Sequence, residues 1–397
     1  MSYLPHQIEK SDELLQVLKD NKIACLWGAP RSGKTRTAIR TVEGFKTPLV
    51  LTKKNAIPGW KSELKACGAN HIHVTNYEQA HKIIPGEHDV IIIDESHNLN
   101  KVGKQTKRFR DIRELAYITP CLFLTGTPAI EKQAGLYYQL GVSQYSPFAQ
   151  FRSFYDFFRC YGVPETLWIG GRQINQYNKV KPELMEKVLP YVVEMTQADA
   201  GISCNATDKV HTVKLGPAVT QWINKIKKDG VVKLDGEEYA FESDMAVRSA
   251  IHQSESGAVL LDGGIQMLPC YEVVNYIKTA FGDSPDVALM AHFRSTREKL
   301  KQELPKCHIY SSDGHAEGVN LSHYKHFVIV NSGYSGAKFV QRRERIVNIN
   351  RDTEAVVHHI VTDNGISKDV YNAVSNKKDY NIQLFRHART TNSKEDT

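Results

Sequence analysis

The segment Gly28–Thr35, GAPRSGKT, constrains the fold of this chain more than any other stretch. It matches the pattern G-x-x-x-x-G-K-[ST]. It stands between an apolar run, Ile23–Trp27, and a stretch with helical spacing, Thr35–Gly44. A glycine-rich loop between a strand and a helix gathers backbone N–H groups at the helix N-terminus, where phosphate binds. Because the flanking strand and helix are both present, the pattern predicts a phosphate-binding loop rather than a chance match.

Each residue type in this loop has a chemical reason. Gly28 and Gly33 let the backbone curl so that its N–H groups converge on phosphate oxygens. Lys34 is expected to bring a positive charge to the terminal phosphates, and the Thr35 hydroxyl to bind Mg²⁺. The alternative, a glycine-rich turn with a surface lysine, leaves the flanking strand and helix unexplained. The expected cofactor-binding loop is completed by Ala29, Pro30, Arg31 and Ser32.

Short apolar runs alternate with helical stretches along the first 140 residues. Most of these runs are rich in Val, Ile and Leu without polar alternation, which is typical of parallel strands buried on both faces. Strand–helix alternation predicts a doubly wound α/β domain over residues 1–140. The runs are Ile23–Trp27, Pro48–Thr52, His71–Thr75, Asp89–Ile93 and Pro120–Leu124.

Two carboxylates, Asp94 and Glu95, follow the run Asp89–Ile93 directly. Side chains at the carboxyl end of a strand lie where open α/β sheets bind ligands. We expect Asp94 to hold Mg²⁺, usually through water, and Glu95 to orient and deprotonate an attacking water. An acidic pair after a strand is common, and its position behind a phosphate-binding loop is what makes it specific.

The chain changes character after residue 140. Residues 141–280 combine dense aromatic residues with longer amphipathic stretches, which predicts a mostly helical insertion. We interpret its Phe and Tyr residues as helix core rather than a stacking platform for nucleic acid. A second, smaller α/β domain is expected over 281–384, and the polar tail 385–397 is expected to be disordered. The strand-like runs of the second domain are Val287–Ala291, Cys307–Ser311, Phe327–Asn331 and Val356–Val361.

Several of these segments match the motifs of one enzyme superfamily. Asp94–His97, DESH, resembles the D-E-x-H box of superfamily 2 helicases and translocases. Leu124–Pro128, LTGTP, resembles their third motif, which couples the state of ATP to domain movement. Leu4–Gln7, LPHQ, resembles their adenine-reading segment, with Gln7 as the base contact. The resemblance assigns the coupling role to His97, Thr125, Gly126 and Thr127.

Further segments resemble the Snf2-like branch of this superfamily. Val50–Trp60 and Val74–Gln79 resemble two of its early motifs, and Ser146–Gly162 resembles the start of the insertion in annealing-helicase relatives. The resemblance implies two RecA-like domains, each a doubly wound parallel sheet, with ATP hydrolysed in the cleft between them. A chain this short looks like the minimal motors of bacteriophages and bacteria.

The second domain carries three matches to the same superfamily. Val287–Leu304 resembles motif IV, Ala316–Ser322 resembles motif V and Phe339–Ile346 resembles motif VI. Relatives usually have a further strand–helix unit between motifs IV and V, whereas here only a short segment separates them. The resemblance therefore implies a reduced second domain.

Motif VI of this superfamily supplies arginines that stabilise charge on the transferred phosphoryl group. In its pattern a glutamine is followed four residues later by the first finger arginine, and Gln341 and Arg345 satisfy this spacing. The second arginine of the family would fall at Asn348. Arg342, Arg343 or Arg351 would then have to replace it, or they form an ordinary charged surface.

Contacts to the backbone of nucleic acid need hydroxyls, amides and cations rather than base-reading side chains. The stretch Lys101–Arg113 is the most basic one, although a solvated helix face explains it as well. No base-reading module is visible, which predicts sequence-independent, salt-sensitive binding, and the resemblance favours duplex or branched DNA. The candidate contacts are Lys53, Lys54, Thr75, Asn76, Lys101, His292, Arg294, Asn320 and Ser322.

Composition excludes several other classes of protein. The 397 residues are 41% hydrophobic and 24% charged with a net charge of +7, which is typical of a soluble multidomain protein with a polyanionic partner. No apolar run approaches the roughly 18–20 residues of a membrane span. The seven cysteines are scattered and never form C-x-x-C, which argues against disulfides or structural zinc. We expect a monomer in the cytoplasm of a bacterium or of a phage-infected host.

Together these observations predict an ATP- and Mg²⁺-dependent DNA translocase that remodels or unwinds duplex or branched DNA. One alternative is a superfamily 2 helicase that loads on single-stranded DNA or RNA. Another is a degenerate motor that binds nucleotide and DNA as a clamp, an idea motivated by Asn348 and the short second domain.

Overall fold

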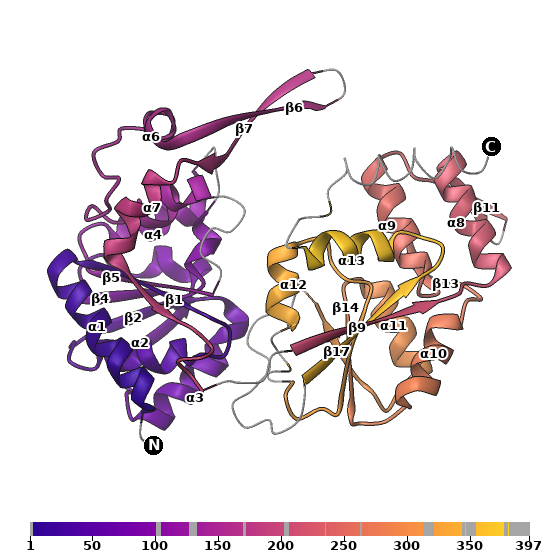
Figure 1. Ribbon diagram of the computed structural model, residues 1–397, viewed down its shortest axis with the longest axis horizontal. Coiled ribbons are helices and arrows are strands. Elements are labelled where there is room, and N and C mark those ends of the chain that lie inside the picture. The colour runs from indigo at the N-terminus through magenta and orange to yellow at the C-terminus, as the bar shows by residue number, and fades with distance from the viewer. Residues whose placement is uncertain are drawn as a thin grey trace. The chain divides into compact units, whose positions relative to one another are not determined.

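The structure of the protein is a computed structural model, and it divides into two compact units, Met1–Ser203 and Cys204–Thr397, which are described separately (Figure 1). The residues that it describes are 3–100, 105–126, 133–169, 172–201, 206–234, 236–262, 264–312, 321–343, 346, 355–376 and 380.

The first unit is built on a parallel sheet of six strands in the order β3-β2-β4-β5-β1-β8. Because every pair is parallel, the carboxyl ends of all six strands meet at one edge of the sheet. In this order β5 lies between β1 and β4. The strands are β1 (Ile23–Gly28), β2 (Pro48–Thr52), β3 (His73–Asn76), β4 (Val90–Ile93), β5 (Cys121–Thr125) and β8 (Val192–Met195).

Two hydrophobic cores cover the two faces of this sheet. Alternate side chains of each strand point to opposite faces, so that in β1 Ala24 joins one core and Cys25 the other. One core contains residues of α1 (Pro5–Asn21), α2 (Lys34–Val42) and α3 (Ile57–Cys67). The other contains residues of α4 (Lys107–Ala116), α5 (Leu136–Leu140), α6 (Phe154–Tyr161) and α7 (Glu183–Val188). The apolar strand sequence follows from this burial on both faces.

A long antiparallel ribbon projects from the first unit (Figure 1). Its strands are β6 (Gly162–Ile169) and β7 (Arg172–Val180), with a register shift between Val163 and Glu165. At its base, the ring of Tyr177 packs edge-on against Phe158 at a centroid distance of 5.0 Å. Aromatic contacts therefore join the ribbon to α6.

The second unit is built on a parallel sheet of five strands in the order β15-β14-β16-β17-β9. Its first strand in the chain, β9, forms one edge and pairs along its whole length with the last strand, β17. The strands are β9 (Ala206–Val213), β14 (Val287–Ala291), β15 (His308–Ser311), β16 (His326–Val330) and β17 (Ala355–Thr362).

Helices and two short ribbons complete the second unit. The ribbons are β10 (Val231–Leu234) with β11 (Glu237–Ala240), and β12 (Ala258–Leu261) with β13 (Gly264–Met267). Side chains from α8, α9, α12 and α13 share one core with these ribbons, whereas α10 and α11 pack with strands of the sheet. The helices are α8 (Pro217–Asp229), α9 (Asp244–Ser254), α10 (Glu272–Phe281), α11 (Arg294–Glu303), α12 (Gly336–Arg343) and α13 (Ser367–Ser375).

The predicted α/β class and the predicted strands are confirmed. Each of the nine apolar runs coincides with a strand to within two residues at either end, and Pro48–Thr52 and Val287–Ala291 match β2 and β14 at both ends. The expected helix Thr35–Gly44 corresponds to α2, Lys34–Val42. Burial on both faces makes such runs recognisable in the sequence.

The expected domain boundaries at 140 and 280 differ from the observed division at 203/204. The stretch 141–280, expected to be a mostly helical insertion, contributes β8 to the sheet of the first unit and β9 to that of the second. It also forms three antiparallel ribbons. β8 and β9 are edge strands, and β9 is polar and largely exposed, so neither shows the apolar run of a central strand. The tail 385–397 lies outside the described residues.

Candidate phosphate-binding site

The loop between β1 and α2 has a tightly turned backbone. Gly33 has φ of 95° and Arg31 has φ of 68°, both in the left-handed region. A Cβ atom at Gly28 would lie 2.7 Å from Cδ of Lys34, and one at Gly33 would collide with Nε2 of Gln7. Glycine is therefore required at both positions, because the backbone turns sharply at one and is closely approached at both.

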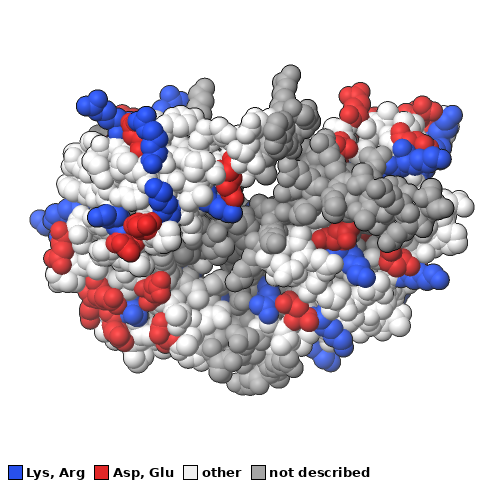
Figure 2. Space-filling view, turned by 45° about the horizontal axis from the view of Figure 1, so that its top comes forward, with Lys and Arg blue, Asp and Glu red and all other residues white. Residues whose placement is uncertain are grey.

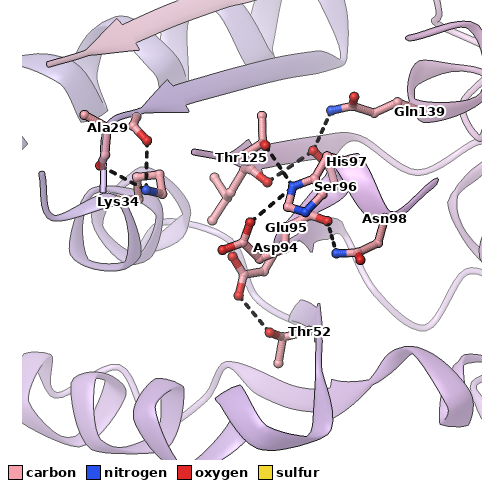
Figure 3. Close-up of polar contacts among 12 residues, drawn as sticks. Ala29, Lys34, Thr52, Asp94, Glu95, Ser96, His97, Asn98, Thr125 and Gln139 are labelled. Atoms are coloured by element: carbon pink, nitrogen blue, oxygen red, sulfur yellow. Dashed lines mark hydrogen bonds and ion pairs between the residues drawn. The ribbon is translucent and has the colours of Figure 1, made fainter. Parts of the chain in front are cut away.

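Lys34, the first residue of α2, extends over this loop (Figure 3). Its Nζ donates hydrogen bonds to the carbonyl oxygens of Gly28, at 2.8 Å, and Ala29, at 3.0 Å. Thr35 follows as the second residue of the same helix. The predicted pair thus stands at a helix N-terminus, where the helix dipole and free backbone N–H groups favour an anion.

Contacts from outside the loop hold its shape, and these were not anticipated from the sequence. The backbone N–H of Ala29 donates to the carbonyl of Met195 in β8 at 2.7 Å. Nε2 of Gln197 donates to the carbonyl of Pro30 at 3.3 Å, and Nε2 of His6 lies 3.0 Å from the carbonyl oxygen of Ser32. The edge strand β8 therefore supports the loop from one side.

Gln7, the expected base contact, lies against this loop and is only 3% exposed. Its Oε1 accepts a hydrogen bond from the backbone N–H of Leu4 at 3.0 Å, which caps the first turn of α1. The structure brings Gln7 next to Gly33, and its expected contact with a nucleotide base stays a prediction.

Asp94 stands at the carboxyl end of β4 and is held by two side chains, of which Figure 3 shows Thr52. Its Oδ2 accepts hydrogen bonds from Oγ1 of Thr52, at 2.7 Å, and from Nε1 of Trp60, at 2.8 Å. Burial, assisted by the nearby negative charge of Glu95, raises the pKa of Asp94 from 3.8 to about 6. The two hydrogen bonds and the positive charge of Lys34 act in the opposite direction and lower this pKa.

Glu95 adopts a left-handed backbone conformation with φ of 51°. This conformation is rare for glutamate, and it starts a tight turn in which Asn98 donates to the Glu95 carbonyl from its backbone N–H, at 3.0 Å, and from its side chain, at 2.6 Å. Oε2 of Glu95 lies 3.3 Å from Nδ1 of His97. Strained backbone of this kind is often found at functional sites.

A set of hydrogen bonds joins this turn to β5 and α5 (Figure 3). Nδ1 of His97 lies 3.1 Å from Oγ1 of Thr125, and the Ser96 hydroxyl donates to the carbonyl of Leu124 at 3.1 Å. Nε2 of Gln139 donates to the Ser96 hydroxyl at 2.6 Å. The structure thus places His97 in contact with Thr125, while their expected coupling role stays a prediction, and it adds Gln139, which the sequence did not indicate.

Gly126, the next residue, approaches the phosphate-binding loop. A Cβ atom there would lie 3.4 Å from the Gly28 carbonyl oxygen and 3.4 Å from Nζ of Lys34. The third predicted motif therefore reaches the loop through Gly126, while its Thr127 lies outside the described residues.

The arginine-rich segment of the second unit is described only in part. Gln341 lies in α12, but its side chain and the whole of Arg345 lie outside the described residues, so their expected roles stay predictions. Arg342 is 1% exposed and donates from Nε to the carbonyl of Ser312 at 3.1 Å. Arg343 forms an ion pair with Asp208 of β9, with 2.6 Å between Nε and Oδ2. Both of these arginines contribute to the packing of the second unit.

The candidate nucleic-acid contacts are spread over both units. Lys53, Lys54, Thr75 and Asn76 lie at or just beyond the carboxyl ends of the neighbouring strands β2 and β3. The side chain of Asn76 caps the following turn by accepting from the N–H of Gln79 at 3.1 Å. In the second unit the structure describes His292, Arg294 and Ser322. Lys101 of the first unit and Asn320 of the second lie outside the described residues.

The positive charge is not concentrated on one visible surface. On the face drawn in Figure 2, the blue basic side chains and the red acidic side chains of the described residues lie interspersed. Within the described ranges, no group of three or more His, Cys, Asp or Glu side chains forms an arrangement suited to a metal ion. No described helix is both long and apolar enough to cross a membrane.

Comparisons with protein-family models and with curated proteins returned no match to this chain.

Proposed function

We propose that this protein is a DNA-dependent ATPase of the superfamily 2, Snf2-like type, which couples ATP hydrolysis to movement along duplex or branched DNA. The observation that carries the proposal is the convergence of Lys34, Asp94, Glu95 and Thr125. They lie at the carboxyl ends of β1, β4 and β5, which are neighbours in the sheet. Open parallel sheets bind their ligands at this edge.

The residues of this site fit ATP and Mg²⁺. The loop is free of Cβ atoms at Gly28 and Gly33, and Lys34 already places its ammonium group on carbonyl oxygens of the loop. Phosphates would be held by the loop N–H groups and Lys34, and Mg²⁺ by Thr35 and by Asp94 through water. When bound, Mg²⁺ neutralises charge that develops on the phosphates.

Glu95 is the residue proposed to take a proton from the attacking water. Its carboxylate is close to the Asp94 charge and to His97, and its left-handed backbone fixes its direction. His97 then links Glu95 to Thr125 of β5. A change at the phosphates would thereby be transmitted to the segment after β5, which is the coupling role that the resemblance implies.

The parallel sheet of each unit, flanked by helices, is consistent with two RecA-like domains. In the proposed enzyme Arg345 stabilises charge on the transferred phosphoryl group, and Gln341 positions it. The proposed DNA contacts are the nine residues named above, of which six lie at or beyond the carboxyl ends of β2, β3 and β14. Their side chains suit contacts to a nucleic-acid backbone, and duplex or branched DNA is what the resemblance implies.

Phosphate release measured with single-stranded, duplex and forked DNA and with RNA tests the proposal. We expect duplex or forked DNA to stimulate turnover most. Removing a general base costs about 10²–10⁴-fold in rate, so Glu95→Gln should lower turnover by at least about 100-fold. Lys34→Ala should abolish turnover and weaken ATP binding. Lys19→Ala and Glu87→Gln, at exposed positions of the same unit, are matched controls that should leave turnover unchanged.

Each contrary outcome identifies a different function. Equal stimulation by RNA and duplex DNA would contradict the Snf2-like assignment. A requirement for a single-stranded tail would favour a single-strand-loading helicase. Binding of ATP and DNA without any turnover would indicate the degenerate clamp.

A further inference from the structure

A cleft of about 300 Å³ opens on the first unit, lined by residues of α4, α5, α6 and the segment 141–153. None of its lining residues belongs to the phosphate-binding loop or to the DESH turn. Its volume is at the lower end of the range for pockets that hold small ligands. The proposed ATPase does not use it, so its chemistry calls for a separate explanation.

Aromatic side chains form both the floor and the rim of this cleft. Phe109, Tyr138 and Phe154 line it and are themselves buried in the core of the unit. At the rim, by contrast, Tyr117 is 41% exposed and Tyr155 is 58% exposed. Flat rings that remain open to solvent are able to stack on a planar ligand.

Two arginines give the rim its charge. Arg113 and Arg152 are exposed and line the cleft, and the guanidinium carbon of Arg113 lies 5.2 Å from the ring centroid of Tyr117. None of the described residues that line the cleft is acidic, and the adjacent Asp156 of α6 is engaged by an ion pair with Arg159 and by a 2.9 Å hydrogen bond from the Ser153 hydroxyl. The remaining positive charge favours an anionic ligand.

Two buried hydroxyls inside the cleft add hydrogen-bonding capacity. Oγ of Ser143 accepts from the N–H of Tyr145 at 3.3 Å, and Oγ of Ser146 accepts from the N–H of Phe148 at 3.2 Å. Both serines line the cleft, and among the described contacts neither hydroxyl donates its hydrogen. A ligand with acceptor atoms beside an aromatic ring suits this lining.

We propose that this cleft binds one nucleotide unit, with the base stacked on Tyr117 or Tyr155 and the phosphate held by Arg113 and Arg152. Rings and cations interleaved in this way bind single-stranded nucleic acid without sequence preference, because every base has a π-face. A free mononucleotide carries the same chemistry. That the nucleotide belongs to the DNA on which the protein moves rests on the proposed function; the binding itself does not.

Fluorescence anisotropy with a labelled oligothymidylate, without ATP, tests the binding. The double variant Arg113→Gln/Arg152→Gln should weaken binding about tenfold, because it removes both charged contacts to the phosphate and leaves the stacking rings in place. The matched control is Lys107→Gln/Arg110→Gln, which removes the same charge from exposed positions of α4 outside the cleft lining. Equal losses in the two double variants, or no loss in the first, would overturn the proposal.

Crosslinking locates the nucleotide directly. An oligothymidylate with 4-thiothymidine should crosslink to peptides that contain Tyr117 or Tyr155, and Tyr155→Ser should reduce the yield. Crosslinks confined to other peptides would contradict the proposal. It would also be contradicted if a polyglutamate peptide displaced the oligonucleotide from the cleft and nucleotides did not. Competition by thymidine monophosphate would identify free nucleotide as the source, and competition by strands alone would identify nucleic acid.

The outcomes separate this inference from the proposed function. Anisotropy and crosslinking need no hydrolysis, so a protein without ATPase activity still supports the cleft if these measurements succeed. Conversely, unchanged oligonucleotide binding and normal DNA-stimulated turnover in Arg113→Gln/Arg152→Gln would contradict the proposed nucleotide cleft. The proposed ATPase function would remain supported. Circular dichroism of both double variants verifies that they fold.

Discussion

Gln139 donates a 2.6 Å hydrogen bond to the hydroxyl of Ser96, which in turn donates to the carbonyl of Leu124. Gln139 is fully buried in α5, Ser96 belongs to the DESH turn and Leu124 lies in β5. The neighbours of Gln139 in α5, Tyr137 and Tyr138, line the aromatic cleft. One short helix therefore touches both the candidate catalytic turn and the proposed nucleotide cleft.

Gln139→Met tests whether this link matters for turnover. Among the described residues Oε1 of Gln139 has no hydrogen-bond partner, so methionine removes an unsatisfied acceptor together with the bond to Ser96. These effects oppose each other, and we expect the free energy of unfolding to change by less than about 1 kcal/mol. Turnover should fall several-fold with little change in ATP affinity, because the DESH turn loses one of its supports.

Steady-state ATPase kinetics and denaturant unfolding of the same variant give both quantities. Gln16→Met, at a surface position of α1 where the glutamine bonds only to Asp20 among described contacts, is the control. If the two variants have the same turnover, Gln139 fills space and does not support the site.

The sequence predicted the strands better than the boundaries of the units. Central strands such as Ile23–Gly28 are buried on both faces, and the resulting apolar runs are visible without a structure. β9 is an edge strand with Asp208, Lys209 and His211, and it pairs with β17, which lies far along the chain. Its sheet membership depends on that long-range pairing, so no local pattern could predict it.

The same distinction applies to the candidate site. Gly28, Lys34 and Asp94 stand in local patterns whose chemistry fixes their spacing, and they could be predicted. Trp60 and Gln139 act through hydrogen bonds to residues distant in sequence, Asp94 and Ser96. Such partners are decided by tertiary packing, which a single sequence does not display.

Trp60→Phe should shift the pH dependence of turnover. The Trp60 N–H donates to Oδ2 of Asp94 and thereby lowers the pKa of a carboxyl group that burial has raised to about 6. Without this bond the pKa of Asp94 rises further. In the proposed site Asp94 holds Mg²⁺ in its ionised form, so the acidic limb of the rate profile should move to higher pH, by roughly one unit.

The rate of ATP hydrolysis between pH 5 and 9 at saturating Mg²⁺ measures this shift. Thr52→Val removes the other hydrogen bond to Oδ2 and should move the limb in the same direction. Trp222→Phe removes a comparable Trp N–H bond, to the Ser254 hydroxyl in the second unit, and should leave it in place. A limb that stays in place or moves to lower pH in Trp60→Phe would show that Asp94 does not control it.

Replacing Arg342 is expected to reduce stability, whereas replacing Arg345 is expected to reduce turnover. The Arg342 guanidinium is buried and bonded to the Ser312 carbonyl, so Arg342→Ala should cost about 2–4 kcal/mol of the stability of the second unit. Arg345→Ala should abolish turnover and leave ATP binding and stability largely unchanged. Arg343→Ala breaks a partly exposed ion pair with Asp208 and should cost about 1 kcal/mol or less.

Thermal unfolding, binding of a fluorescent ATP analogue and phosphate release, measured on all three variants, distinguish these roles. Full turnover in Arg345→Ala would mean that another arginine is the finger. A stable but inactive Arg342→Ala would point to Arg342 instead.

Glu255 is expected to make the second unit less stable as the pH rises. This carboxyl group is 1% exposed and accepts hydrogen bonds from the N–H of Ile366, at 2.7 Å, and from the Thr362 hydroxyl, at 2.6 Å. It thereby anchors the turn before α13. Burial nevertheless outweighs these bonds and raises the pKa of Glu255 from 4.5 to about 7.

The sign of the effect follows from proton binding. Between pH 4.5 and 7 the folded protein holds a proton on Glu255 that the unfolded chain has released, so stability falls as the pH rises through this window. Glu255→Gln does not titrate. Relative to this variant, the natural protein should lose up to about 3 kcal/mol across the window, since one pKa unit corresponds to about 1.4 kcal/mol.

Amide hydrogen exchange of the segment 362–370, corrected for the intrinsic pH dependence of exchange, reports the local free energy of opening. Opening should become easier between pH 4.5 and 7 in the natural protein and should change less in Glu255→Gln. Glu298→Gln, on the exposed side of α11, is the control and should follow the natural protein. If the free energy of opening had the same pH dependence in the natural protein and in Glu255→Gln, Glu255 would be ionised throughout this range. Its four hydrogen bonds from Thr362, Ile366 and Ser367 would then outweigh its burial.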